Sequence, residues 1–138
     1  MADGVVALDA NGLTVAGSVM HPHTRAIVAA SAYAVMTGNK VAGIYDHTAG
    51  RHLPIAAECR GRRLQAYDGE RSVNFGGTLP DLYDGGDEAF VSFETDGSKV
   101  RGYDRGSASF YEAKIGDQLV QLYDHGASAW FAFNVQLA

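Results

Sequence analysis

Residues 79–135 read LPDLYDGGDEAFVSFETDGSKVRGYDRGSASFYEAKIGDQLVQLYDHGASAWFAFNV, and one phrase recurs in them every twenty residues. The phrase is Tyr-Asp-x-Gly, and it begins at Tyr83, Tyr103 and Tyr123. Seven residues after each tyrosine comes an aromatic residue: Phe90, Phe110 and Trp130. This strict register indicates a repeated structural unit.

Looser copies of the phrase lie upstream, at Tyr67-Asp68-Gly69 and Tyr45-Asp46-His47, so five of the seven tyrosines precede an aspartate. In a Tyr-Asp-x-Gly hairpin, the aspartate accepts a hydrogen bond from a backbone N–H two residues on. The glycine then supplies the positive φ of a type I turn with a bulge. Each tyrosine is therefore predicted to end a strand, and each following aspartate to lie in a turn.

Between these copies a second turn is needed, and Asp96-Gly97 and Gly116-Asp117 supply suitable residues. Each unit then consists of two antiparallel strands of about six residues, the common strand length. The remaining strands are expected near 41–45, 53–58, 62–67 and 72–75.

The N-terminal quarter shows a different pattern. Two apolar runs, Val5–Leu8 and Leu13–Met20, flank Asp9-Ala10-Asn11-Gly12, and Asn-Gly between such runs predicts a hairpin. Residues 25–36 could form a helix packed on all sides, capped by Thr24 and ended by Gly38. Residues 32–36 and 41–45 also read as a hairpin, so the sequence leaves helix and strand open here.

Composition agrees with one domain over residues 1–138. The chain has 46% hydrophobic and 20% charged residues with 17 glycines, which is typical neither of disorder nor of a membrane span. The first residues lack the basic and apolar regions of a signal peptide, so cytoplasmic synthesis is expected, with incorporation into a particle as one further destination. The net charge of −5 argues against general nucleic-acid binding.

Alternation along the strands separates two faces. If the glycine closes the turn as expected, one face is the core; replacing Phe110 or Trp130 with alanine should then cost about 3 to 5 kcal/mol. The members of this face are Leu82, Phe90, Val100, Phe110, Val120, Leu122 and Trp130. The other face contains Tyr83, Tyr103 and Tyr123 with other aromatic residues, and is too apolar for ordinary solvent surface.

The predicted fold is all-β, with antiparallel hairpin repeats forming a sandwich or barrel and at most one helix near 25–36. The tyrosine-rich face could be covered by the N-terminal half, by another subunit or by a glycan. We expect a non-catalytic structural subunit that self-associates or decorates a larger particle, such as a virion or phage component. The alternative is a lectin-like carbohydrate-binding module, and a small enzyme comes third. In either binding role, the expected ligand or partner surface comprises Tyr83, Arg101, Tyr103, Gln121 and Tyr123.

Other chemistry is less well indicated, and no catalytic residue, metal site or cofactor is predicted. Histidines follow Tyr-Asp at His47 and His125, where a base or metal ligand would fit, but glycine and arginine occupy the same slot elsewhere. Cys59, the single cysteine, is next to Arg60, which could activate its thiol, but a cysteine in a strand is more often a small core residue. The basic cluster Arg60-Gly61-Arg62-Arg63 could bind a phosphate group or could simply form a solvent-exposed hairpin turn.

In its Tyr-Asp and glycine, the phrase resembles the tyrosine-aspartate repeats of Rhs-type shell proteins, in which the glycine falls one position later and is followed by arginine. Only residues 45–51, Tyr-Asp-His-Thr-Ala-Gly-Arg, share that order, and there the glycine falls later still. The resemblance covers the phrase alone, so we do not assign the chain to that family.

Overall fold

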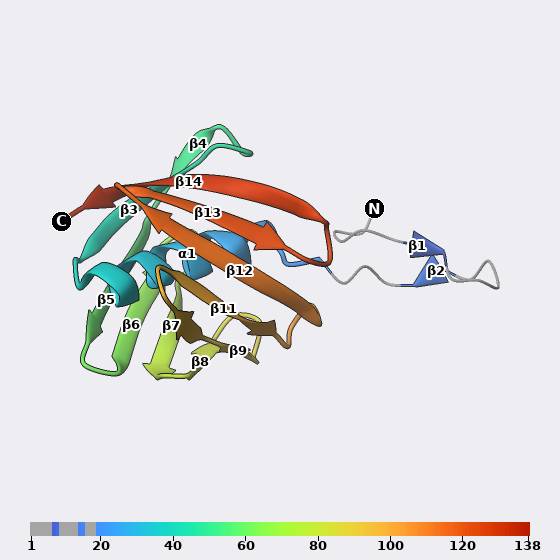
Figure 1. Ribbon diagram of the computed structural model, residues 1–138, viewed down its shortest axis with the longest axis horizontal. Helices are drawn as coiled ribbons and strands as arrows, with labels where there is room; N and C mark the ends of the chain where they lie inside the picture. The colour runs from blue at the N-terminus through green and yellow to red at the C-terminus, as the bar shows by residue number, and fades with distance from the viewer. Residues whose placement is uncertain (1–6, 9–13, 16–18) are drawn as a thin grey trace.

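The computed structural model describes residues 7–8, 14–15 and 19–138 of the chain. One helix, α1 (Pro22–Thr37), accompanies the strands, and Figure 1 shows their arrangement. The strands are β1 (Ala7–Leu8), β2 (Thr14–Val15), β3 (Val41–Asp46), β4 (Arg51–Leu53), β5 (Ile55–Arg60), β6 (Arg63–Asp68), β7 (Val73–Thr78), β8 (Asp81–Asp84), β9 (Ala89–Ser92), β10 (Glu94–Asp96), β11 (Lys99–Asp104), β12 (Ser109–Gly116), β13 (Leu119–Asp124) and β14 (Ala129–Leu137).

Ten strands close into an antiparallel barrel, in the order β11-β12-β13-β14-β3-β5-β6-β7-β8-β9. The pairing of Asp104 on β11 with Val91 on β9 closes the ring. Two further strands extend it, β10 beside β11 and β4 beside β3. The all-β prediction is confirmed, and the sheet closes as a barrel rather than a sandwich.

At the N-terminus, β1 and β2 pair with each other in a separate two-stranded sheet. The hairpin predicted there has its paired strands, whereas its expected turn at residues 9–12 lies outside the described residues.

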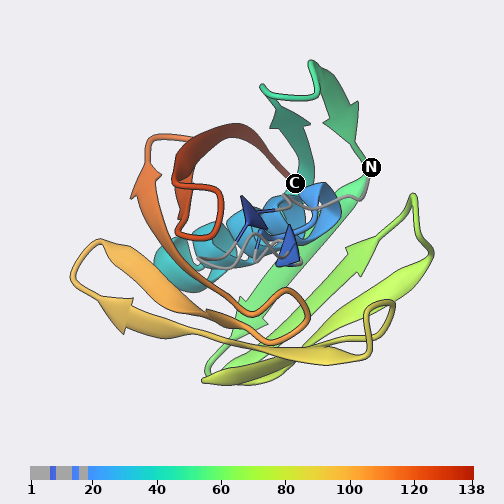
Figure 2. The same ribbon diagram turned by 90° about the vertical axis from the view of Figure 1, so that its right-hand side faces the viewer.

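The helix runs through the interior of the barrel, as the view along the barrel in Figure 2 shows. It packs against β3, β5 and β6 on one side and β11 to β14 on the other. Its residues from Thr24 to Ala34 are all buried, and many are alanine, whose small side chain lets the backbone approach the strands on several sides. Residues 25–36 are thus helical, and the alternative hairpin from residue 32 is wrong.

Both helix ends have identifiable causes. Pro22 occupies the first turn, where its missing N–H removes no hydrogen bond, and His21 rather than Thr24 is the N-cap. Gly38 ends the helix as predicted, with φ 74° and its N–H donating to the carbonyl oxygen of Ala34 at 2.9 Å.

The core face differs from its prediction in its aromatic members. Leu82, Val100, Val120 and Leu122 are buried as expected. Phe90, Phe110 and Trp130 instead lie on the outside, 47%, 62% and 49% exposed. The large rings that the strands place inside the barrel are Phe75, Phe93, Tyr111 and Phe133, and the helix adds Tyr33.

The length of the turn explains why Phe90, Phe110 and Trp130 point outward. Asp84 pairs with Ala89, leaving a four-residue loop, so Tyr83 lies directly opposite Phe90 and both side chains point outward. The strand ends at the aspartate, one residue later than predicted. The left-handed residue is the fourth after the aspartate, not the glycine of the phrase: Gly50, Ser72, Glu88, Ala108 and Ser128 have φ between 52° and 69°.

The second turns of the repeat fall within one residue of their prediction. They lie at Gly97-Ser98 and Asp117-Gln118, and in each the left-handed residue, Gly97 or Gln118, has positive φ.

A pair of phenylalanines tests the assignment of the two faces. Phe133→Ala removes a fully buried ring and should lower the free energy of unfolding by about 3 to 5 kcal/mol. Phe110→Ala removes a largely exposed ring and should change it by less than about 1 kcal/mol. Chemical denaturation of both variants measures the difference, and equal losses would contradict the burial described.

Candidate interaction surface

The five Tyr-Asp turns share one hydrogen-bond pattern, built on a buried aspartate. Oδ1 of Asp84 accepts from the backbone N–H groups of Gly86 and Asp87, at 2.8 and 2.9 Å. Asp46, Asp68 and Asp124 accept from the second and third following N–H groups in the same way, and Asp104 accepts from the second. All five are at most 4% exposed, so each carboxylate is committed to holding its own turn.

In two of the strict copies of the phrase, the glycine lies close to the carboxylate of its own turn. A Cβ atom at Gly86 would lie 2.6 Å from Nη1 of Arg71 and 3.3 Å from Oδ1 of Asp84. At Gly106 a Cβ atom would lie 3.3 Å from Oδ1 of Asp104. Thr48 and Glu70 occupy this position in the two looser copies, whose aspartates accept the same hydrogen bonds, so the turn itself tolerates a side chain there.

Carboxylates of the turns also hold the start of the helix. Oδ2 of Asp124 accepts from the N–H of Met20 at 2.8 Å, and Arg25 donates to the carbonyl oxygen of Met20 at 2.7 Å. Asp87 accepts from Thr24 and faces the His23 ring at 3.0 Å. These negative groups lie where the helix dipole is positive, which favours the observed direction of the helix in the barrel.

One half-buried arginine, Arg71, links neighbouring turns. Arg71 donates to Oδ2 of Asp68 at 2.7 Å and to both oxygens of Asp84 at 3.1 Å. Burial alone would raise the pKa of Asp84, but the hydrogen bonds from Arg71 and the backbone outweigh it and lower that pKa. Asp104 has no arginine of this kind: burial raises its pKa, against hydrogen bonds from Ser107 and Gly106.

Outside the barrel, the tyrosines form cross-strand pairs with the residue seven positions later. The rings of Tyr83 and Phe90, Tyr103 and Phe110, and Tyr123 and Trp130 have centroids 4.6 to 5.1 Å apart. Tyr45 pairs with His52 at 4.8 Å, and Tyr67 lies opposite Asn74. We call the outward residues Tyr45, Tyr67, Tyr83, Phe90, Tyr103, Phe110, Tyr123 and Trp130 the aromatic belt.

The residues predicted as a partner surface all have outward positions. Arg101 and Tyr103 lie on β11, Gln121 and Tyr123 on β13, and Tyr83 on β8. Between β11 and β13, strand β12 adds three outward side chains that the prediction missed: Phe110, Glu112 and Lys114. Pairing β11 with β12 in the correct register would have found two of them, because Phe110 lies opposite Tyr103 and Glu112 lies opposite Arg101.

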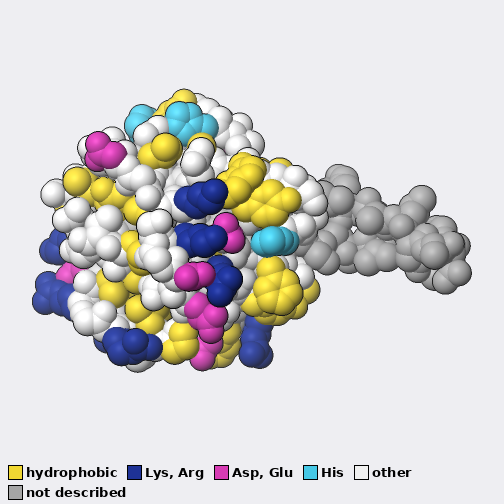
Figure 3. All heavy atoms as spheres, in the orientation of Figure 1, with side chains coloured by type: hydrophobic (Ala, Val, Ile, Leu, Met, Phe, Trp, Pro, Cys, Tyr) yellow, Lys and Arg dark blue, Asp and Glu magenta, His cyan; other side chains and the backbone are white. Residues whose placement is uncertain are grey.

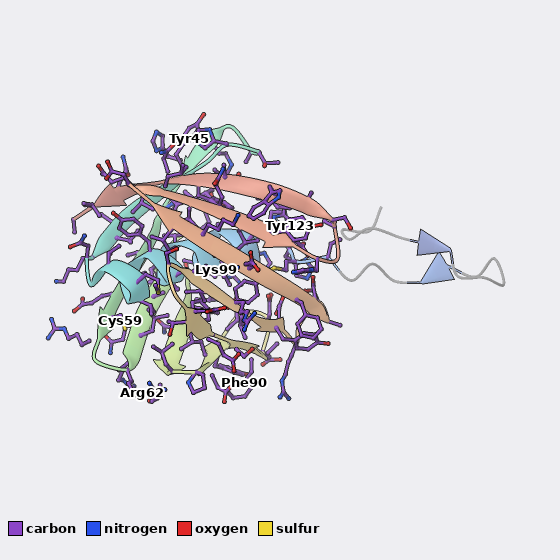
Figure 4. The ribbon with its side chains drawn as sticks, in the orientation of Figure 1. Tyr45, Cys59, Arg62, Phe90, Lys99 and Tyr123 are labelled. Atoms are coloured by element: carbon purple, nitrogen blue, oxygen red, sulfur yellow. The ribbon has the colours of Figure 1, made fainter. Side chains whose placement is uncertain are left out.

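We call the part of the belt on β11 to β14 the aromatic face; it consists of Tyr103, Phe110, Tyr123 and Trp130. Charged groups lie beside the rings: Glu112 lies 3.5 Å from Lys99, and Lys114 is 4.9 Å from the centroid of the Trp130 ring. Figure 3 shows hydrophobic side chains gathered toward one end of this side, beside basic and acidic ones. In Figure 4, Tyr123 lies toward that end, and Cys59 and Arg62 lie toward the other.

The remaining candidate groups lie apart from this face. His47 bonds to Asn134 on the outer surface, and among the described residues no three histidine, cysteine, aspartate or glutamate side chains are grouped to hold a metal ion. Burial raises the pKa of the Cys59 thiol, the direction opposite to an activated thiolate. Arg60, Arg62 and Arg63 surround the turn between β5 and β6.

A groove on the outer surface of β5 to β8 was not predicted. It has a volume of about 930 Å³ and is lined by Tyr67 and Tyr83 of the belt, by Lys40, Glu58 and Arg63, and by small residues. The sequence signal for it was the pair Gly76-Gly77 within a strand, which often marks a close backbone approach.

Comparisons with known proteins give no relative: no family model, no curated protein and no solved structure matches the chain. Among the described residues, no helix has both the length and the apolar character needed to cross a membrane.

The opposite pKa shifts of two repeat aspartates predict opposite pH dependence. Asp84 has a lowered pKa, so its ionised form stabilises the fold above the ordinary value of about 3.9, and this contribution is lost as pH falls through the folded pKa. Asp84→Asn should lower the free energy of unfolding relative to the unmodified protein, and this loss should therefore be smaller at acid pH.

Asp104 has a raised pKa, so its protonated form stabilises the fold; this contribution is present below about 3.9 and is lost as pH rises. For Asp104→Asn, the loss of unfolding free energy relative to the unmodified protein should instead be larger at acid pH. Denaturant unfolding at neutral and acid pH measures both slopes, and parallel slopes would contradict the assignment.

Proposed function

We propose that this protein is a non-catalytic structural subunit that self-associates, or decorates a larger particle, through the aromatic face. The observation that carries the proposal is the exposure of Phe110 and Trp130, 62% and 49%, beside Tyr103 and Tyr123. Large aromatic residues are enriched in the cores of protein interfaces, and contiguous exposed patches of them mark interaction sites.

The interior of the barrel supports a role for the outer surface. Barrels of this size often bind small ligands inside, but here α1 and core rings such as Phe75 and Phe133 occupy that space. The buried aspartates are committed to turns and to the start of the helix. The outer surface then remains for recognition.

The geometry of the face suits a protein partner. The rings of each pair are tilted by 56° to 58°, which leaves edges and clefts for interdigitating side chains. Glu112, Lys114 and Arg101 place both signs of charge among the rings, so a second copy related by a two-fold axis could oppose unlike charges. A virion or phage-type component is one form that such a subunit could take.

Carbohydrate binding by the repeated tyrosines is the alternative. Sugars stack on exposed ring faces, and Gln121 and Arg101 beside the tyrosines could bond to hydroxyl groups. The tilt within each pair disfavours a flat platform across neighbouring rings. We therefore place this function second for the aromatic face.

Sedimentation of a double variant tests the proposal. In Phe110→Ser/Trp130→Ser the core is untouched, so the β-sheet circular dichroism should persist while the assembled mass falls toward the 14.6 kDa of one chain. The matched control is Tyr67→Ser/Leu137→Ser, which removes two side chains of 44% and 42% exposure away from this face. The control should keep the mass of the unmodified protein.

Two results would count against assembly through this face. One is an unmodified protein that sediments as a single chain at high concentration and binds no particle surface. The other is a control variant that loses as much mass as Phe110→Ser/Trp130→Ser. If Phe110→Ser/Trp130→Ser instead loses glycan binding while its assembled mass stays unchanged, the result would support carbohydrate binding as the function of this face.

A further inference from the structure

The groove on β5 to β8 is separate from the aromatic face and has its own construction. Two rows of directly paired residues cross it on the outer side. One row is Ala56, Tyr67 and Asn74, and the other is Glu58, Gln65, Gly76 and Tyr83. In each row a tyrosine stands beside a residue with little or no side chain, so the ring borders a hollow.

Close packing of the backbone keeps the hollow open. A Cβ atom at Gly76 would lie 2.3 Å from the carbonyl oxygen of Leu64, so no side chain fits at the centre of the second row. Ala42 and Ala56 add only methyl groups to the lining. The resulting volume of about 930 Å³ is within the range of ligand sites.

The polar groups beside the rings are available to a ligand. Among the described residues, the side chains of Gln65, Tyr67 and Asn74 make no hydrogen bond within the chain, and Tyr67 is 44% exposed. Two amides and a phenol next to a ring face can bond to hydroxyl groups while the ring stacks on a sugar.

Basic groups outnumber acidic ones at one end of the groove, where Lys40 and Arg63 line it together with Glu58, which forms ion pairs with Lys40 and Arg60. Arg60 and Arg63 are directly opposite each other on β5 and β6, an arrangement of like charges that an anion between them would relieve. Arg60 is bonded to Glu58, whereas Arg63 has no acceptor among the described residues. Arg63 and Tyr67 are four positions apart on one strand, a distance of about 13 Å along the backbone.

We propose that this groove binds an acidic oligosaccharide, with sugar rings stacked on Tyr67 and Tyr83 and a carboxylate or sulfate group held by Arg63. A peptide added as a strand fits less well, because β5, β6 and β7 have paired neighbours on both sides. A single-stranded nucleic acid needs a basic track along its whole length, whereas the basic groups lie at one end here.

Calorimetry with matched sugars tests the site. The probes are oligogalacturonate, its neutral methyl ester, chondroitin sulfate and oligomers of sialic acid. The unmodified protein should bind at least one acidic probe. If that probe is oligogalacturonate, its methyl ester should bind more weakly by about fivefold or more.

Two variants separate stacking from charge. Tyr67→Ser should weaken every sugar that binds, by about fivefold or more. Arg63→Gln should weaken only acidic sugars and leave the methyl ester unchanged. The control Phe110→Ser/Trp130→Ser should bind as the unmodified protein does, which keeps this result independent of assembly.

Three results would overturn the proposal: no binding of any acidic probe, binding that Tyr67→Ser leaves intact, or equal binding of polyglutamate or oligothymidylate. Equal binding of polyglutamate or oligothymidylate would show that the site recognises negative charge and not a sugar. Tyr67→Ser should also leave the sedimenting mass unchanged, so failure here and failure of the assembly model give different data.

Discussion

The buried carboxylate that accepts the N–H groups of its own turn is the interaction on which this barrel depends. In each copy it fixes a four-residue loop with a left-handed fourth residue, and hence the pairing of the tyrosine with the residue seven positions later. A buried carboxylate without such donors would cost several kcal/mol. The hydrogen bonds of the turn therefore offset the cost of burying each aspartate, and the same bonds determine the register of the strands.

Carboxylates of two turns, one of them a buried repeat aspartate, also orient the helix. Asp124 and Asp87 belong to different turns, yet both bond to residues at the start of α1, so closing the barrel and seating the helix are coupled. Arg25 supports this arrangement from inside: burial lowers its pKa, while the charges of Asp124 and Asp46 act in the opposite direction. Its guanidinium also stacks 3.8 Å from the centroid of the Phe131 ring. Because the helix fills the barrel, the interactions that we propose for this protein use its outer surface.

The sequence predicted the repeats, the antiparallel strands and the end of the helix at Gly38, because these follow from local chemistry. It could not assign the faces, because one residue of loop length exchanges inside and outside. Phe110 and Trp130 were placed in the core for this reason. Arg101, Tyr103, Gln121 and Tyr123 do lie on a face other than the core, and their role as a partner surface stays a prediction. The groove depends on side chains of four successive strands, β5 to β8, lining up in two rows beside Gly76, and the sequence marks only the glycines.

The repeat keeps its turn constant and varies what faces outward. The tyrosine stays, but its cross-strand partner is His52, Asn74, Phe90, Phe110 or Trp130. Where the partner is aromatic, the belt is broad and apolar; where it is Asn74, with Gly76 nearby, the ring borders a polar hollow. Because the carboxylate, not the outer pair, holds each turn, these partners can differ without cost to the fold. One repeated unit can therefore present the aromatic face on one side of the barrel and the groove on the other, the two surfaces for which we propose assembly and ligand binding.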